Sequence, residues 1–156
     1  MFSITVSRAL GVADVRATFE ESVRPGLRTV VELDGGGPPD LTGDLWVGLV
    51  VTTDPAWPLS LDVLGADDCG LGPHPDLRVA ERLAECHGVD VLCGVDPAFV
   101  DVDPQDPYYR LALVGGRWYL ASTAGTRLAG PYAAPDEDGF RDDPVELIRQ
   151  VEMDLR

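Results

Sequence analysis

Residues 108–123 read YYRLALVGGRWYLAST, and this stretch decides the class of fold. Two segments rich in strand-forming residues, Tyr108 to Val114 and Arg117 to Thr123, flank the pair Gly115-Gly116. A two-residue glycine turn between such segments is typical of a β-hairpin, because glycine tolerates the positive φ angles that the turn needs. The stretch therefore predicts two neighbouring antiparallel strands. Trp118 and Tyr119 should then lie on opposite faces of the sheet, one in the core and one open to solvent or a partner.

Other strands are predicted from alternating or continuous apolar runs. The C-terminal residues 144–156 fit either a helix or a strand, and the alternation of Val151, Met153 and Leu155 with charged residues favours a strand. The remaining predicted strands are Phe2 to Val6, Thr29 to Leu33, Leu45 to Thr53, Leu59 to Val63 and Val89 to Val95.

Two helices are predicted from apolar residues at three- and four-residue steps. The first begins after Gly11 and ends before Pro25-Gly26, and the second begins with Asp76 as its N-cap and ends at Gly88. The sequence thus predicts a single α+β domain over residues 1–156, with the two helices packed on one face of a mostly antiparallel sheet.

Composition restricts the partners. The chain has 27 Asp plus Glu against 12 basic residues, all arginine, and a formal net charge of -15. This charge disfavours nucleic acid and anionic membranes and favours a basic protein. The absence of lysine excludes a Schiff base and a phosphate-binding loop of the GxxxxGK[ST] type. The sequence leaves the oligomeric state open.

The expected location is the cytoplasm. The odd number of cysteines, three, does not suggest a disulfide framework. The first residues lack the basic and apolar regions of a signal peptide, and the longest apolar run, Leu45 to Val51, is too short to cross a bilayer.

Five potential metal-ligating residues fall in one region, and they are Cys69, His74, Cys86, His87 and Cys93. They lack the CxxC or HxxxH spacing of zinc sites, so no metal or other cofactor is predicted, although the sequence does not decide the question. No GxSxG motif accompanies Ser60 or Ser122, and no catalytic residue is assigned. His74, between two prolines, is expected in an exposed loop, and His87 near the C-terminal dipole of the second helix.

Carboxylates and aromatic rings occur together in several predicted turns, a combination that suits binding to arginine- or lysine-rich surfaces. Trp57 is expected at the surface because a proline follows it in a turn. The Asp-Pro steps of residues 101–106 also suit turn formation. The predicted partner-binding residues are Trp57, Asp67, Asp68, Asp101, Asp103, Asp106 and Tyr108.

The leading hypothesis is a non-enzymatic acidic interaction protein that binds a basic protein, for example an immunity protein that neutralises a cationic toxin. One alternative is a small-molecule-binding protein or hydrolase-like enzyme with a pocket lined by the acidic loops. Another is an acidic scaffold subunit of a larger assembly, which predicts a contiguous apolar surface patch.

Overall fold

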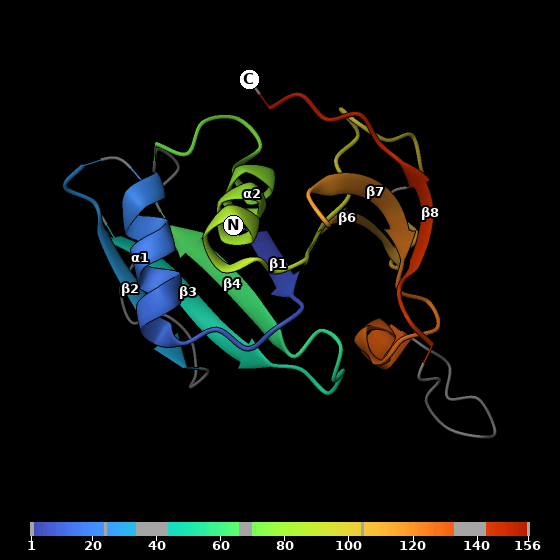
Figure 1. Ribbon diagram of the computed structural model, residues 1–156, viewed down its shortest axis with the longest axis horizontal. Helices are drawn as coiled ribbons and strands as arrows, with labels where there is room; N and C mark the ends of the chain where they lie inside the picture. The colour runs from blue at the N-terminus through green and yellow to red at the C-terminus, as the bar shows by residue number, and fades with distance from the viewer. Residues whose placement is uncertain are drawn as a thin grey trace.

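The computed structural model describes residues 2–23, 25–33, 44–65, 70–103, 105–132 and 143–155. They form one eight-stranded sheet in the order β2-β3-β4-β1-β5-β6-β7-β8, with both α-helices on one face (Figure 1). The strands are β1 (Phe2–Val6), β2 (Arg28–Leu33), β3 (Asp44–Val51), β4 (Leu59–Gly65), β5 (Val91–Cys93), β6 (Tyr109–Val114), β7 (Arg117–Ser122) and β8 (Glu146–Gln150). The helices are α1 (Val12–Ser22), α2 (Pro75–His87) and the 3-10 helix η1 (Arg127–Tyr132).

The predicted α+β architecture is confirmed. All neighbouring strands are antiparallel except β2 and β3, which run parallel with Val31 opposite Val47. The hairpin forms between β6 and β7, and Gly115 and Gly116 have φ angles of 58° and 79°. These positive values are the ones that glycine adopts without the steric penalty of a Cβ atom.

The main core lies between the helices and the sheet. Phe19 of α1 and Leu77 and Leu83 of α2 are fully buried there, together with the inward residues of the strands. Trp118 belongs to this core, whereas Tyr119 packs on the opposite face in a second, smaller cluster, as the alternation predicts. That smaller cluster is built around Trp57, Leu92, Ala112 and Ala121.

Several predicted boundaries differ from the structure. The N-cap of α2 is His74, and Asp76 lies in the first turn instead of capping the helix. Pro75 causes this difference, because proline is well accommodated at the first helical position and allows the helix to start earlier. At the other end Gly88 adopts the expected left-handed conformation, with φ 64°.

The strand prediction at the C-terminus is correct in type but not in position. β8 covers Glu146–Gln150, and the alternating residues Val151, Met153 and Leu155 follow it without strand structure. Val151 and Leu155 are nevertheless buried, at 5% and 8% exposure. The alternation therefore reflects side chains that anchor an irregular segment to the core.

Candidate functional site

The predicted partner-binding residues have different environments in the part of the chain that the structure describes. Trp57 is only 8% exposed and packs in the second cluster, so the expectation that it lies at the surface is wrong. Asp54 closes the turn before Trp57, because its side chain accepts a hydrogen bond from the Ala56 backbone at 2.9 Å and its carbonyl accepts one from the Trp57 amide at 3.2 Å. Asp67 and Asp68 lie outside the described residues.

The loop around Asp101, Asp103 and Asp106, which we call the acidic loop, forms turns, as its sequence suggests. Asp103 accepts a hydrogen bond from the Gln105 backbone, and Asp106 accepts one from the Tyr108 backbone, both at 2.9 Å. Asp101 and Asp103 are exposed, and Tyr108 is half-buried. The carboxylates of Asp103 and Asp106 therefore stabilise the turns of the loop. Their role in binding a partner stays a prediction.

His74 is not the exposed loop residue that its neighbouring prolines suggested. Its Nδ1 lies 2.5 Å from Oδ2 of Asp96, and its ring packs edge-on against Phe99. His74 has a φ of 55°, the one positive value of a non-glycine residue in the described ranges. Such a conformation is maintained by surrounding contacts, here the tie between the start of α2 and the loop after β5.

Asp76 lies in the first turn of α2, near this pair. Burial raises the pKa of its carboxyl group above the ordinary value, and the charge of Asp96 acts in the same direction. His74 and Asp96 have the orientation of a general base with its carboxylate partner. Among the described residues, however, no side chain forms a hydrogen bond with Nε2 of His74, so no protein nucleophile is in place.

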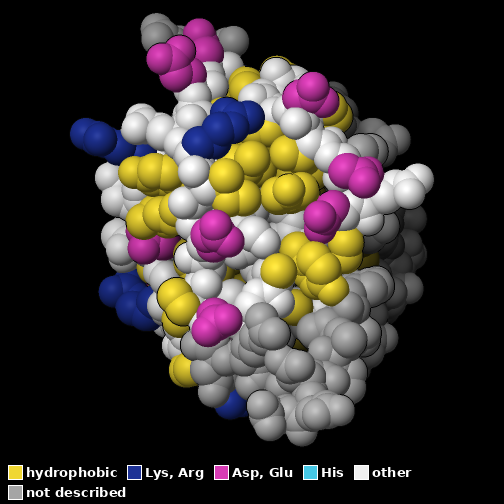
Figure 2. Space-filling model, turned by 90° about the vertical axis from the view of Figure 1, so that its right-hand side faces the viewer, with side chains coloured by type: hydrophobic (Ala, Val, Ile, Leu, Met, Phe, Trp, Pro, Cys, Tyr) yellow, Lys and Arg dark blue, Asp and Glu magenta, His cyan; other side chains and the backbone are white. Residues whose placement is uncertain are grey.

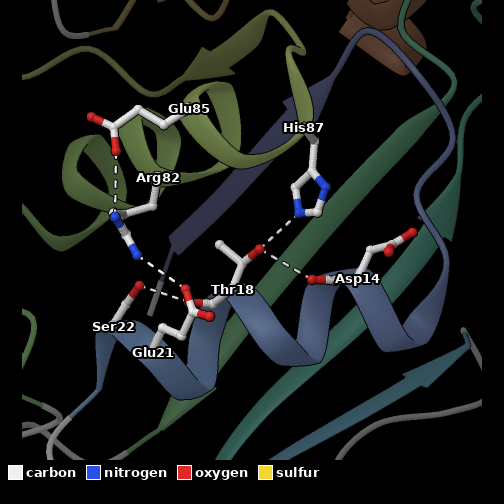
Figure 3. Close-up of polar contacts among 7 residues, drawn as sticks. All are labelled: Asp14, Thr18, Glu21, Ser22, Arg82, Glu85 and His87. Atoms are coloured by element: carbon white, nitrogen blue, oxygen red, sulfur yellow. Dashed lines mark hydrogen bonds and ion pairs between the residues drawn. The ribbon is translucent and has the colours of Figure 1, made fainter.

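His87 lies in the last turn of α2, as expected, and its ring also joins the two helices (Figure 3). Its Nε2 lies 2.8 Å from Oγ1 of Thr18, which donates its own proton to the Asp14 carbonyl at 3.0 Å. Because the hydroxyl has one proton, Nε2 of His87 is the donor in the first bond. Nearby, Arg82 of α2 pairs with Glu21 of α1 at 3.1 Å.

Among the described residues, the cysteines do not form a metal site with the histidines. Cys93 is buried, and burial raises the pKa of its thiol well above the ordinary value, which keeps it protonated and unreactive. Cys86 is exposed, and Cys69 lies outside the described residues. In the part of the chain that the structure describes, no three His, Cys, Asp or Glu side chains are arranged to hold a metal ion.

A hollow on the described surface lies between α2 and the segment that follows β8. Two open pockets of about 650 and 560 Å³ adjoin there, because both are lined by Glu81 and Met153. We call the two together the C-terminal groove. Its lining residues are Arg78, Glu81, Ala84, Glu85, Gly88, Val89, Asp90, Phe99, Leu113, Gly115, Gly116, Trp118, Glu152, Met153, Asp154 and Leu155.

Hydrogen bonds to backbone carbonyls hold the two sides of this groove together. The Val151 amide donates to the Trp118 carbonyl at 2.9 Å, which attaches the C-terminal segment to β7. Arg78 of α2 donates to the carbonyls of Pro73 and Leu155. The groove is thus a product of long-range contacts between α2 and the end of the described chain.

The lining of the C-terminal groove is acidic as well as apolar. Its charged lining residues are the carboxylates Glu81, Glu85, Asp90, Glu152 and Asp154 and one guanidinium, that of Arg78. Trp118 donates its indole N–H to Glu81 at 3.2 Å, so this carboxylate is fixed beside the aromatic ring. Because five carboxylates outnumber one guanidinium, the groove combines negative potential with an apolar lining.

A third pocket, of about 390 Å³, lies beside Trp57 on the other side of the sheet. Asp54, Arg127, Asp143 and Val145 also line it. With one guanidinium and two carboxylates, it is less acidic than the C-terminal groove.

Comparison with protein-family models, with curated proteins and with solved structures finds no match to the chain. Within the described ranges, no helix is both long enough and apolar enough to cross a membrane. The geometry of the groove is therefore the main guide to function.

Proposed function

We propose that this protein is an acidic interaction protein that binds a basic protein partner through the C-terminal groove. The observation that carries the proposal is the groove itself, in which five carboxylates surround an apolar lining that includes Phe99, Trp118 and Met153. One concrete form of this function is an immunity protein that neutralises a cationic toxin in the cytoplasm.

The two properties of the groove act at different stages of binding. A net charge of -15 accelerates encounter with a basic protein and disfavours nucleic acid and other polyanions. Once contact is made, removal of apolar surface from water contributes about 25 cal/mol per Å² before the costs of association are subtracted. A partner with arginine or lysine beside an apolar residue matches both properties.

The proposal can be tested with a defined probe, a fluorescein-labelled peptide in which arginine and leucine alternate. Fluorescence anisotropy at low and high salt measures its affinity for the protein. The peptide should bind at low salt and dissociate as the Debye length shrinks, from about 10 Å at 0.1 M toward about 3 Å at 1 M. A peptide with glutamate in place of arginine should not bind.

Three charge reversals locate the binding site. Glu152→Arg lies in the groove, Asp101→Arg in the acidic loop and Glu20→Arg on the exposed side of α1. All three change the net charge equally, so long-range attraction falls by a similar amount in each. We expect Glu152→Arg to weaken the peptide at least about fivefold relative to Glu20→Arg. Equal effects of all three reversals would refute a groove site, and a specific effect of Asp101→Arg would place binding in the acidic loop.

A hydrolase-like enzyme is the second candidate, and the contact between His74 and Asp96 favours it. In this function His74 would activate water or a hydroxyl of the substrate, because a carboxylate partner orients the ring. A panel of chromogenic ester and phosphoester substrates tests it. Turnover that is lost in His74→Ala, with unchanged circular dichroism, would support the enzyme over the interaction protein.

A further inference from the structure

The outer edge of the sheet at β8 is a surface that the proposed function does not use. All five residues of β8 are exposed, and β8 is the last strand in the sheet order. Its two large apolar side chains, Leu147 and Ile148, are 42% and 43% exposed. Figure 2 views the molecule from the side where β8 lies and shows hydrophobic side chains gathered there, with acidic side chains among them.

A β-bulge in β8 interrupts the regular alternation of its side chains between the two faces of the sheet. Leu147 lies opposite Ala121 and Arg149 lies opposite Leu120, so Ile148 is the additional residue between two regular pairs. Because paired residues share a face and Ala121 and Leu120 belong to opposite faces, Leu147 lies on the outer face and Arg149 on the helix face. Glu146, opposite Ser122, lies on the helix face as well.

We propose that two copies of this chain associate through antiparallel pairing of their β8 strands. In this pairing Glu146 of each copy lies opposite Arg149 of the other, and Leu147 and Ile148 of both copies lie next to the axis. The strand is therefore self-complementary in charge, and its exposed apolar residues meet each other. The inference is independent of the proposed function, since it uses a different surface.

Symmetry is consistent with this register. A two-fold axis between antiparallel copies of one strand is perpendicular to the sheet and leaves each side chain on its own face. Residues that pair across the axis must therefore share a face. In a regular strand Glu146 and Arg149 would lie on opposite faces, and the bulge is what brings both to the helix face.

Charge at this edge differs from the charge of the whole chain. Two copies with a net charge of -15 repel each other at long range, but at about 0.15 M salt the Debye length is only about 8 Å. Charged pairs in direct contact across the strands are screened less. Bulges and charged residues usually prevent an edge strand from pairing with strands of other molecules. Here the positions of Glu146 and Arg149 still permit antiparallel pairing with a second β8 strand.

The experiment is a charge swap on the full chain, read by sedimentation velocity over a range of protein concentrations. The wild-type protein should sediment with twice the mass of one chain at the higher concentrations. Arg149→Glu places two glutamates opposite each other, and Glu146→Arg places two arginines opposite each other. Because each pair occurs twice in the dimer, we expect either single variant to raise the dissociation constant about tenfold or more.

The double variant Glu146→Arg with Arg149→Glu restores opposite charges and leaves the net charge unchanged. Its dissociation constant should return to within about threefold of the wild-type value. Arg117→Glu at the hairpin is the control, because it changes the net charge as Arg149→Glu does but lies on β7 away from the edge. Circular dichroism verifies that each variant is folded.

A wild-type protein that stays monomeric at all concentrations would overturn the proposal. The proposal is equally wrong if Arg117→Glu weakens the dimer as much as Arg149→Glu does. Failure of the folded double variant to regain the dimer would show that the charged pairs do not face each other.

Discussion

Gly48 supports the packing of Trp46 on the sheet face away from the helices, and Gly48→Ala tests this contact. A Cβ atom at position 48 would lie 2.9 Å from Cζ3 of the Trp46 ring and closer still to Cη2. Real Cβ atoms do not approach other atoms this closely, so the indole must rotate away. Its N–H donates to Glu32 at 3.1 Å, and this hydrogen bond would be lost or lengthened by the rotation.

The expected loss of stability follows from two opposing contributions. Overpacking with displacement of the ring costs about 1–3 kcal/mol. Replacing a strand glycine by alanine returns about 0.5–1 kcal/mol through the lower entropy of the unfolded chain. Taking the middle of each range, the free energy of unfolding should therefore fall by about 1 kcal/mol. Urea denaturation followed by circular dichroism measures this free energy. An unchanged m-value shows that the variant exposes the same surface on unfolding as the wild type.

Two further variants separate the clash from a general effect of alanine. A Cβ atom at position 94 would meet no other atom within 4 Å, so Gly94→Ala should change the free energy of unfolding by less than about 0.5 kcal/mol. In a Trp46→Leu background the large ring is absent, and Gly48→Ala should then be neutral or slightly stabilising. An equal loss in the wild-type and Trp46→Leu backgrounds would refute the steric argument.

Two other predictions concern α2. Burial raises the pKa of Asp76, so the folded state binds its proton more tightly than the unfolded state, and stability from this group falls as the pH rises through the range just above about 4. Urea unfolding from about pH 3 to pH 7 should therefore show Asp76→Asn gaining stability relative to wild type as the pH rises; a constant difference would contradict the burial effect. Thr18→Val removes the hydroxyl that links His87 to α1 and should lower the unfolding free energy by about 1 kcal/mol, with Ala17→Val at an exposed position of the same helix as the control for β-branching. Equal losses in the two variants would mean that the bond to His87 contributes nothing.

The sequence predicted those elements that depend on local chemistry. The β6–β7 hairpin follows from Gly115-Gly116, and the end of α2 follows from Gly88, because both need backbone angles that glycine adopts readily. The apolar periodicity of α1 and α2 likewise predicted that both helices pack on the sheet. These signals lie within a few residues of the feature that they specify.

Features that depend on distant residues could not be predicted in this way. Trp57 is buried by contacts with residues such as Leu128 and Val145, far away in the chain. His74 meets Asp96, 22 residues later, and no local pattern indicates that contact. The C-terminal groove forms because the residues after β8 attach to β7 and α2. Its one sequence signal was the alternation of Val151, Met153 and Leu155, which predicted a strand, whereas the structure shows that Val151 and Leu155 are buried in a segment without strand structure.

The net charge alone favours a basic partner, but the positions of individual charges distinguish the C-terminal groove from the β8 edge. The C-terminal groove carries carboxylates on both sides, so two copies facing each other there would repel, and a basic partner is favoured. β8 carries Glu146 and Arg149 on one face, which makes the same surface attractive to itself. A salt titration should therefore affect the two associations differently. Binding of the basic peptide depends on long-range attraction and should weaken steeply with salt, whereas added salt also relieves the repulsion between two acidic chains and should change the dimer less.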